Sequence, residues 1–311
     1  MKRGAIVAVV LVVVLVLGLT GFYVARNPER EVLDDAARST TLGSFVRLSN
    51  GVTHYELRGP ATARTVVLVH GFSVPYYIWD STTAALEANG FRVLRYDEFG
   101  RGFSDRPDVA YDASLYDRQL AELLDSLHVP GKVDLAGVSM GGWVTATFTG
   151  RHPERVRTLT LVDPVAGSSP AAGGAEALPI VGPYLFQALA VPGMADGQAG
   201  DFVNPGRFPE WAERYRPQMR YKGFGRALLS TRRATAGMNT DTLYARVSAT
   251  GVPVLLLWGQ SDATVPFERN ARVRQAIPAA EFHAIAGAGH LPIVEQATLT
   301  DSLIVGFLRR K

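Results

Sequence analysis

The amino-acid sequence predicts an α/β fold, in which a mostly parallel central sheet is flanked by helices and carries an inserted helical cap. From residue 45 onward, short runs rich in Val and Leu alternate with longer amphipathic stretches, a pattern typical of parallel strands joined by helical crossovers. The alternation stops between Asp163 and Val252, which is too long a gap for a plain loop. We therefore expect residues 45–164 and 251–311 to form the α/β core and residues 165–250 to form the cap.

Each element of the core has a predicted range. An antiparallel hairpin is expected over residues 45–58. The later strands are expected at Thr65–His70, Phe91–Asp97, Val133–Ser139, Thr158–Asp163, Val252–Gly259 and Glu281–Ala286. The crossover helices are expected at Ile78–Asn89, Ser114–His128, Met140–Arg151, Phe267–Ile277 and Leu291–Arg309. The cap begins with a Gly/Ala/Ser/Pro-rich segment, Val165–Gly174, and continues in helix-like pieces interrupted by prolines.

Residues 1–25 are predicted to be a transmembrane anchor or a signal peptide. Lys2 and Arg3 precede an uncharged run from Gly4 to Ala25, which as a helix would extend about 33 Å and could cross a hydrocarbon core of about 30 Å. A cleaved signal peptide normally has a shorter apolar region. Because the run continues through Gly21-Phe22-Tyr23-Val24, we favour an uncleaved anchor.

Both interpretations export the rest of the chain. The basic residues before the apolar run place the N-terminus in the cytoplasm, so residues 31–311 are expected to be membrane-anchored and extracytoplasmic, or secreted after cleavage. Residues 26–44 are polar and charged, and we interpret them as a linker.

Composition excludes several classes of function. The chain has no cysteine, so thiol nucleophiles, disulfides and Cys-ligated metals are excluded. Its formal charge of +3 comes from residues 1–30, which hold four basic residues and one acidic residue and leave 28 of each in residues 31–311. The folded part is therefore neutral overall, and we expect no nucleic-acid partner.

A G-x-S-x-G pentad at Gly137–Gly141 predicts a nucleophile at Ser139. The pentad follows an apolar strand-like run and precedes a helix-like stretch. A serine on such a sharp turn needs neighbours without side chains, which Gly137 and Gly141 provide. The alternative interpretation is a Gly-rich helix start with an incidental serine.

A serine hydroxyl needs a general base, and the base needs an orienting carboxylate. Asp262 lies just beyond the carboxyl end of a predicted strand, and His290 lies in a Gly-rich turn after the last strand. The order Ser139, Asp262, His290 fits a hydrolase triad. Asp163, at the end of another strand, is the alternative carboxylate.

Two backbone N–H groups are expected to bind the oxyanion of the reaction. One belongs to Met140, directly after the nucleophile. The other belongs to Phe72, because Gly71 lets the backbone turn after its strand. His70 is expected to brace this loop.

Together these motifs resemble the α/β-hydrolase superfamily over nearly all of residues 45–311. The similarity is to the serine-hydrolase branch that contains monoacylglycerol lipases, carboxylesterases, ring-cleavage-product hydrolases and cofactor-free haloperoxidases. The stretch Arg95–Asp105 resembles the family loop after the fourth strand, and the resemblance implies that Asp97 and Arg101 are structural. Relatives with an Asp nucleophile, the haloalkane dehalogenases and epoxide hydrolases, are disfavoured by the serine at position 139.

The cap contains a basic region. Residues 207–233 hold eight Arg or Lys residues and two Glu, interleaved with aromatic and apolar side chains. This pattern is compatible with contact with anionic lipid headgroups, or with a solvated helix face above an apolar pocket.

The resulting hypothesis is a serine hydrolase that cleaves carboxylic esters, similar to lipases or monoacylglycerol lipases, and needs no metal or organic cofactor. Its expected partners are a small-molecule or lipid ester and the membrane. The alternatives are a carbon-carbon bond or amide hydrolase, a haloperoxidase-like enzyme, and a ligand-binding protein that has the hydrolase fold without turnover.

Overall fold

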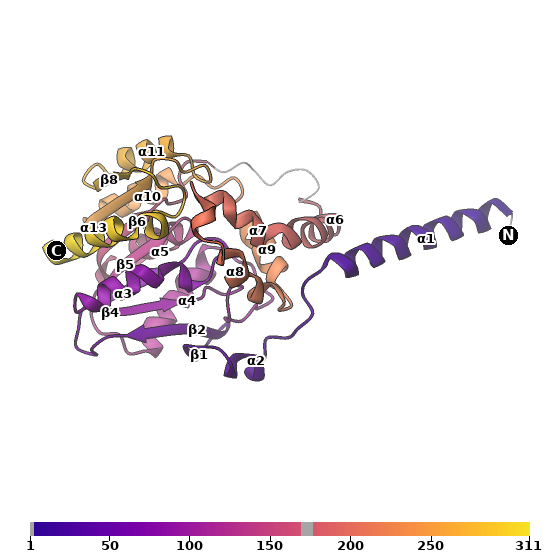
Figure 1. Cartoon of the computed structure of the whole chain (residues 1–311), viewed down its shortest axis with the longest axis horizontal. Coiled ribbons are helices and arrows are strands. Elements are labelled where there is room, and N and C mark those ends of the chain that lie inside the picture. Colours follow the sequence, from indigo (N-terminus) through magenta and orange to yellow (C-terminus); the bar gives the residue numbers. More distant parts are fainter. Residues whose placement is uncertain (1–2, 169–176) are drawn as a thin grey trace.

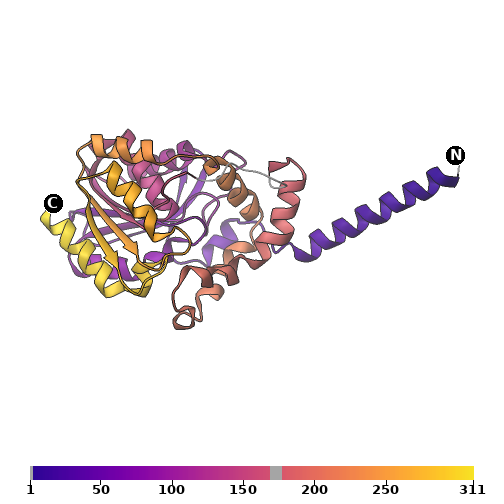
Figure 2. The same cartoon turned by 90° about the horizontal axis from the view of Figure 1, so that it is seen from above.

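The computed structural model describes residues 3–168 and 177–311. A layered α/β body carries the cap at one end, and the N-terminal helix projects from that end (Figures 1 and 2). Most of the Gly/Ala/Ser/Pro-rich segment expected at the start of the cap lies outside the described residues.

One eight-stranded sheet forms the centre, with strand order β1-β2-β4-β3-β5-β6-β7-β8. β1 pairs antiparallel with β2 and β2 pairs antiparallel with β4, whereas all later neighbours are parallel. The strands are β1 (Ser44–Leu48), β2 (Gly51–Arg58), β3 (Thr65–Val69), β4 (Arg92–Tyr96), β5 (Val133–Val138), β6 (Val156–Val162), β7 (Val254–Gly259) and β8 (Glu281–Ile285). The predicted strands are therefore confirmed, with ends that differ by one or two residues.

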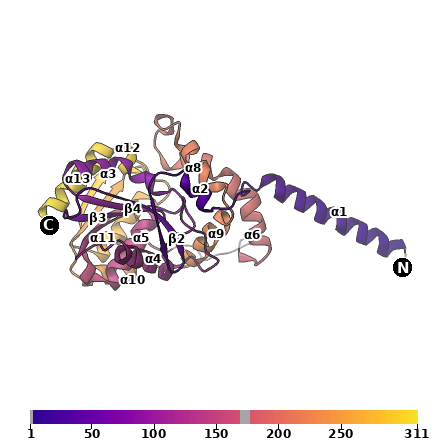
Figure 3. The same ribbon diagram turned by 90° about the horizontal axis from the view of Figure 1, so that it is seen from below.

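Helices cover both faces of the sheet (Figure 3). α3 packs against α13 on one face, and α4, α5, α10 and α11 pack in a row on the other. The core helices are α3 (Asp80–Ala88), α4 (Ala113–Ser126), α5 (Met140–Arg151), α10 (Asp241–Ala249), α11 (Asn270–Ala276), α12 (Pro292–Glu295) and α13 (Ala297–Arg310). α10 falls within the range expected for the cap, yet it packs against α5 and α11.

The apolar strands produce two hydrophobic cores, one on each face of the sheet. In β3, Val67 and Val69 join the core beneath α4 and α5, whereas Val66 and Leu68 join the core that contains residues of α3 and α13. This alternation follows from the two-residue period of a strand. Because both faces are covered, the central strands β3, β5, β6 and β7 are buried along nearly their whole length and are mostly apolar.

The cap is a series of short helical segments between β6 and α10. They are α6 (Val181–Leu185), the π-helical turn η4 (Phe186–Ala190), η5 (Val191–Gly193), α7 (Met194–Gly197), η6 (Gln198–Asp201), η7 (Pro205–Arg207), α8 (Trp211–Met219) and α9 (Phe224–Thr235). The N-terminal part of the chain consists of α1 (Arg3–Arg26) and α2 (Asp35–Ser39).

The predicted last helix, Leu291–Arg309, is interrupted in the structure. Gln296 has φ −124° and ψ 42°, which separates α12 from α13. Just before the break, Glu295 accepts hydrogen bonds from the backbone N–H groups of Gly289 and Val203. The carboxylate thereby links the Gly-rich turn before α12 to the cap.

The close packing at the start of α5 predicts that stability falls sharply when a side chain is added at Gly141. A Cβ added at Gly141 would lie 2.3 Å from the carbonyl oxygen of Val69 and 2.4 Å from that of His70. Since both oxygens belong to the backbone, Gly141→Ala should lower the free energy of unfolding by about 1–3 kcal/mol or more. The measurement is the chemical unfolding midpoint of the full chain in detergent.

Gly193→Ala is the matched control, because nothing lies within 4 Å of a Cβ at that position. Its backbone has φ −91°, so the substitution should be close to neutral. Equal midpoints for the two variants would contradict the steric argument.

Candidate active site

Ser139 lies on a strained turn between β5 and α5. Its backbone has φ 55° and ψ −119°, a region that residues with a side chain rarely adopt. A Cβ at Gly137 would lie 2.2 Å from the carbonyl oxygen of Gly141, so β5 and α5 approach too closely for a side chain at Gly137. The Ser139 N–H donates to the carbonyl of Val162 in β6, which ties the turn to the neighbouring strand.

His290 and Asp262 form a hydrogen-bonded pair. The imidazole Nδ1 lies 2.8 Å from one carboxylate oxygen of Asp262, and the other oxygen accepts the backbone N–H groups of Thr264 and Val265, each at 2.8 Å. Because a carboxylate accepts, Nδ1 carries the proton, and Nε2 of the neutral ring is left as the basic nitrogen. The backbone N–H of His290 also donates to the carbonyl of Asp201 in the cap, at 2.8 Å.

The predicted site residues converge on one pocket of about 220 Å³. Ser139, His290 and Phe72 line it, while Asp262 lies behind His290. Met140 follows Ser139 directly and begins α5, so its N–H is one of the unpaired donors of a helix N-terminus. The pocket is lined further by Gly71, Ser73, Val74, Ile78, Val138, Met194, Gly197, Gln198, Asp201, Thr264 and Leu291.

Arg101 supports the loop that carries Phe72, a contact that the sequence did not predict. Its Nε donates to the carbonyl of Phe72 at 2.8 Å. The same guanidinium donates to the hydroxyls of Tyr116 at 2.5 Å and Thr231 at 3.0 Å. Since Thr231 belongs to α9, one buried cation links the loop that carries Phe72 to the cap.

His70 and Glu98 are buried beneath the same loop. His70 donates from Nδ1 to the carbonyl of Gly71 at 2.7 Å and accepts the Glu98 N–H at Nε2, at 2.9 Å. Burial lowers the pKa of His70 to about 4 and raises the pKa of Glu98 to about 8. At neutral pH the imidazole is therefore uncharged, and its two hydrogen bonds brace the loop.

Asp163, the alternative carboxylate, occupies a different position. One of its oxygens accepts the N–H of Gly259 at 2.8 Å. Burial and the neighbouring charge of Asp262 raise the pKa of Asp163 well above its ordinary value. The carboxylate that bonds to His290 is that of Asp262.

The basic residues of the cap are extensively paired. Arg214 contacts Asp80, Arg216 contacts Asp196 and Glu213, and Arg220 and Arg226 contact Glu31 and Asp108, respectively. These exposed ion pairs form a solvated face. The acidic partners neutralise much of the positive charge of residues 207–233, the region whose sequence pattern was compatible with contact with anionic lipid headgroups.

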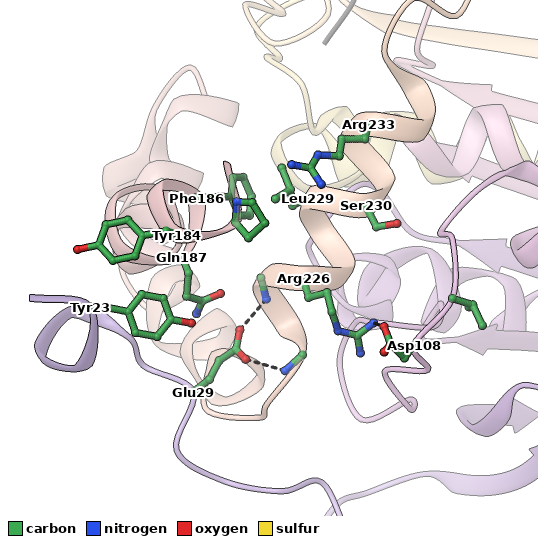
Figure 4. A pocket seen from close by; sticks show the side chains of 14 residues that line it. Tyr23, Glu29, Asp108, Tyr184, Phe186, Gln187, Arg226, Leu229, Ser230 and Arg233 are labelled. Carbon is green, nitrogen blue, oxygen red and sulfur yellow. Dashed lines mark hydrogen bonds and ion pairs between the residues drawn. The ribbon is translucent and has the colours of Figure 1, made fainter. Parts of the chain in front are cut away.

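A larger pocket of about 630 Å³ lies elsewhere, between the end of α1 and the cap. Figure 4 shows Tyr23 of α1 close to Tyr184 and Gln187, and Arg226 and Arg233 on α9. Neither Ser139 nor His290 lines this pocket, so size alone does not identify the reactive site. Within residues 3–168 and 177–311, no group of three His, Asp or Glu residues is placed to hold a metal ion.

A family model described as alpha/beta hydrolase fold matches residues 64–297. The chain belongs to the α/β-hydrolase family. A 2-hydroxy-6-oxo-2,4-heptadienoate hydrolase of Pseudomonas putida is 30% identical over 253 residues, covering 78% of this chain and 88% of that protein. Lipase 3 of a Moraxella species is 23% identical over 286 residues, covering 86% and 82%.

Solved structures show the same architecture. A thermophilic esterase from Thermogutta terrifontis superimposes with a TM-score of 0.71 at 26% identity, covering 86% of this chain and 99% of that one. The names of these three relatives are those of a heptadienoate hydrolase, a lipase and an esterase, so hydrolase activity is what the three names share.

The pKa of Glu98 predicts how stability depends on pH. The ordinary pKa is 4.5 and the folded value is about 8, so between these pH values the folded state holds more protons than the unfolded state. Stability therefore falls as the pH rises through this interval, by at most about 1.4 kcal/mol per pH unit. Glu98→Gln should remove this decline, so its stability relative to the wild type should increase from pH 5 to pH 8.

The range from pH 7 to 8 is the most informative, because it lies above both the ordinary pKa of His70, 6.5, and its folded value of about 4, so the imidazole is mostly neutral in both states. The measurement is the chemical unfolding curve at several pH values. Glu154→Gln, at an exposed carboxylate, is the control, and its free energy of unfolding should change with pH in parallel with that of the wild type. A parallel curve for Glu98→Gln as well would show that Glu98 is ionised in the folded protein.

Proposed function

We propose that this protein is a serine hydrolase that cleaves carboxylic esters, with lipase-like or monoacylglycerol-lipase-like specificity and a membrane-anchored or secreted catalytic domain. The observation that carries the proposal is the shared pocket, in which a strained Ser139 accompanies a histidine bonded to Asp262. A nucleophile, a general base and an orienting carboxylate are the groups that acyl transfer requires.

In the proposed mechanism, the hydroxyl oxygen of Ser139 attacks the ester carbonyl and its proton passes to Nε2 of His290. Asp262 holds the ring and stabilises the imidazolium. The N–H groups of Phe72 and Met140 donate to the oxyanion. His290 then protonates the leaving alcohol, which leaves an acyl group on Ser139. Water, deprotonated by His290, attacks this acyl-enzyme and releases the acid and the free serine.

The lining of the pocket supports an ester with an apolar acyl group. Val74, Ile78 and Leu291 provide apolar surface, and Asp201 and Thr264 provide polar groups. The volume of about 220 Å³ lies below the roughly 300–1,000 Å³ of pockets for drug-sized ligands. We therefore propose that the acyl chain is of short to medium length.

A carbon-carbon bond hydrolase is the second candidate. It is supported by the similarity to the 2-hydroxy-6-oxo-2,4-heptadienoate hydrolase and to the 2-hydroxymuconate semialdehyde hydrolase of a Pseudomonas species, which is 28% identical over 252 residues. The same nucleophile and base can serve both reactions, because specificity resides in the pocket.

Ser139→Ala should lower kcat/KM for a nitrophenyl ester by at least about 10³-fold, because nucleophilic attack is lost. Labelling by a fluorophosphonate should also be lost. Esterase assays and labelling of the purified full chain measure the two effects. Labelling of the wild type with negligible ester turnover would favour carbon-carbon bond or amide substrates, and an unlabelled wild type would favour a binding protein.

Two neighbouring carboxyl groups provide a matched comparison in the same assay. Asp262→Asn should lower kcat by about 10⁴-fold, because the wrong tautomer of His290 is then favoured. Asp163→Asn should retain most of the activity, because Asp163 is held by Gly259 and not by the imidazole. The reverse order would assign the orienting role to Asp163.

Acyl-chain length tests the lipid part of the proposal. Along a series of nitrophenyl esters, kcat/KM should rise by up to about fourfold per added methylene, from about 0.8 kcal/mol of transfer free energy. The value of kcat/KM should fall again once the acyl chain fills the pocket. Because the pocket is smaller than those that hold drug-sized ligands, we expect this at about four to eight carbons. A continuous decrease from the acetyl ester onward would contradict a substrate of lipid origin.

A further inference from the structure

The cap exposes an apolar face at its N-terminal end. Leu178, Ile180, Val181 and Leu189 are all exposed, with Ile180 84% and Leu189 54% accessible. These residues lie in or beside α6 and η4. We call Leu178–Leu189 the α6 face. Its side chains are too apolar to be explained as solvated surface, so a partner is expected to cover them.

The α6 face lies beside the end of α1. The hydroxyl of Tyr184 donates to the carbonyl of Leu19 at 2.8 Å, and the ring of Tyr184 stacks on that of Tyr23 at 5.6 Å. Arg26 donates to the carbonyl of Ala188 at 3.2 Å. All three views place α6 at the end of the body nearest α1 (Figures 1–3).

These contacts place the α6 face at a defined level along α1. Leu19 precedes Arg26, the last residue of α1, by seven residues, which corresponds to ~10 Å along a helix axis. Part of the cap therefore overlaps the last turns of α1. Within the described residues, α1 is the one helix long and apolar enough to cross a membrane, and none of its residues is buried by the rest of the protein.

The segment after α1 fastens the cap in this position. Both carboxylate oxygens of Glu29 accept backbone N–H groups at the start of α9, from Gly223 at 2.6 Å and Gly225 at 2.7 Å (Figure 4). The backbone carbonyl of Glu31 accepts the N–H of Lys222 at 2.9 Å. The residues expected to form a linker are thus bonded to the cap, and the direction of α1 determines the orientation of the α6 face.

We propose that the α6 face docks on the phospholipid bilayer that α1 crosses, with its apolar side chains at the boundary between headgroups and acyl chains. Helices that lie on a membrane bury their apolar face by about 5–10 Å, which matches the overlap with α1. Tyr23 and Tyr184 occupy the level of an interfacial aromatic belt, and Arg26 and Arg30 lie where cations meet headgroups. The inference rests on the proposed anchoring through α1 and does not depend on ester hydrolysis.

The test uses single cysteines, which are unique labelling sites because the chain has none. Full-length Ile180→Cys and Leu189→Cys are labelled with an environment-sensitive nitrobenzoxadiazole dye and reconstituted in phosphatidylcholine vesicles. Some vesicles carry a nitroxide quencher on carbon 5 of the acyl chain. Leu299→Cys is the matched control, because Leu299 is 48% exposed and apolar but lies on α13, away from α1 (Figure 1).

We expect the dye at positions 180 and 189 to emit at shorter wavelength in vesicles and to be quenched at least about twofold more strongly than the dye at position 299, as a buried interfacial face requires. Equal quenching at all three positions would overturn the proposal. So would a blue shift at position 180 that depends on protein concentration and is insensitive to the lipid quencher, since a second copy of the chain would then cover the face. Failure of ester hydrolysis alone would leave the fluorescence result intact and would count only against the proposed function.

Discussion

The arrangement of the candidate site depends on the left-handed backbone of Ser139. A side chain in this region costs on the order of 1–3 kcal/mol, and the surrounding structure offsets the cost, since β5 and α5 are buried and the Ser139 N–H is held by Val162. The helix starts without a connecting loop, so Gly137 has no room for a Cβ beside the Gly141 carbonyl, and α5 starts so close to the end of β3 that Gly141 has none either. The same turn lifts the hydroxyl above the carboxyl edge of the sheet, where parallel pairing also delivers the residues that follow β3 and β7.

A second layer of buried polar groups holds the loops around this turn. Arg101 bonds to the Phe72 carbonyl and to Thr231 of the cap, so displacement of α9 would be transmitted to the backbone expected to bind the oxyanion. His70 bonds to the neighbouring Gly71 carbonyl. Because an unpaired buried polar group is costly, these bonds favour one arrangement of the loop. The geometry of the candidate site is thus supported by residues that lie outside the proposed proton transfer.

The fold could be predicted because strand burial and helical amphipathicity leave periodic patterns in the sequence, and the family model confirms it. Ser139, Asp262 and His290 could be placed on one edge because each follows a strand end; their roles stay predictions. Other features left no such signal. The bonds of Glu29 to Gly223 and Gly225 join positions almost 200 residues apart, and α10 looks like a cap helix until its packing against α5 and α11 is seen. The bracing by Arg101 depends on one side chain reaching three distant partners, which no local pattern encodes.

The contact between Glu29 and α9 also determines the order of events during synthesis and folding of the chain. Gly223, the nearer of the two residues that donate to the Glu29 carboxylate, lies 194 residues further along the chain. At about 5–20 residues synthesised per second, roughly 10–40 s pass before that partner exists. During this time the N-terminal helix has already been made, while the Glu29 carboxylate lacks its two donors at the start of α9 and the cap is not yet bonded to this segment. Closure of such a long loop is entropically slow, so the joining of the segment after α1 to the cap belongs to the last stages of folding, after the N-terminal strands are available to pair.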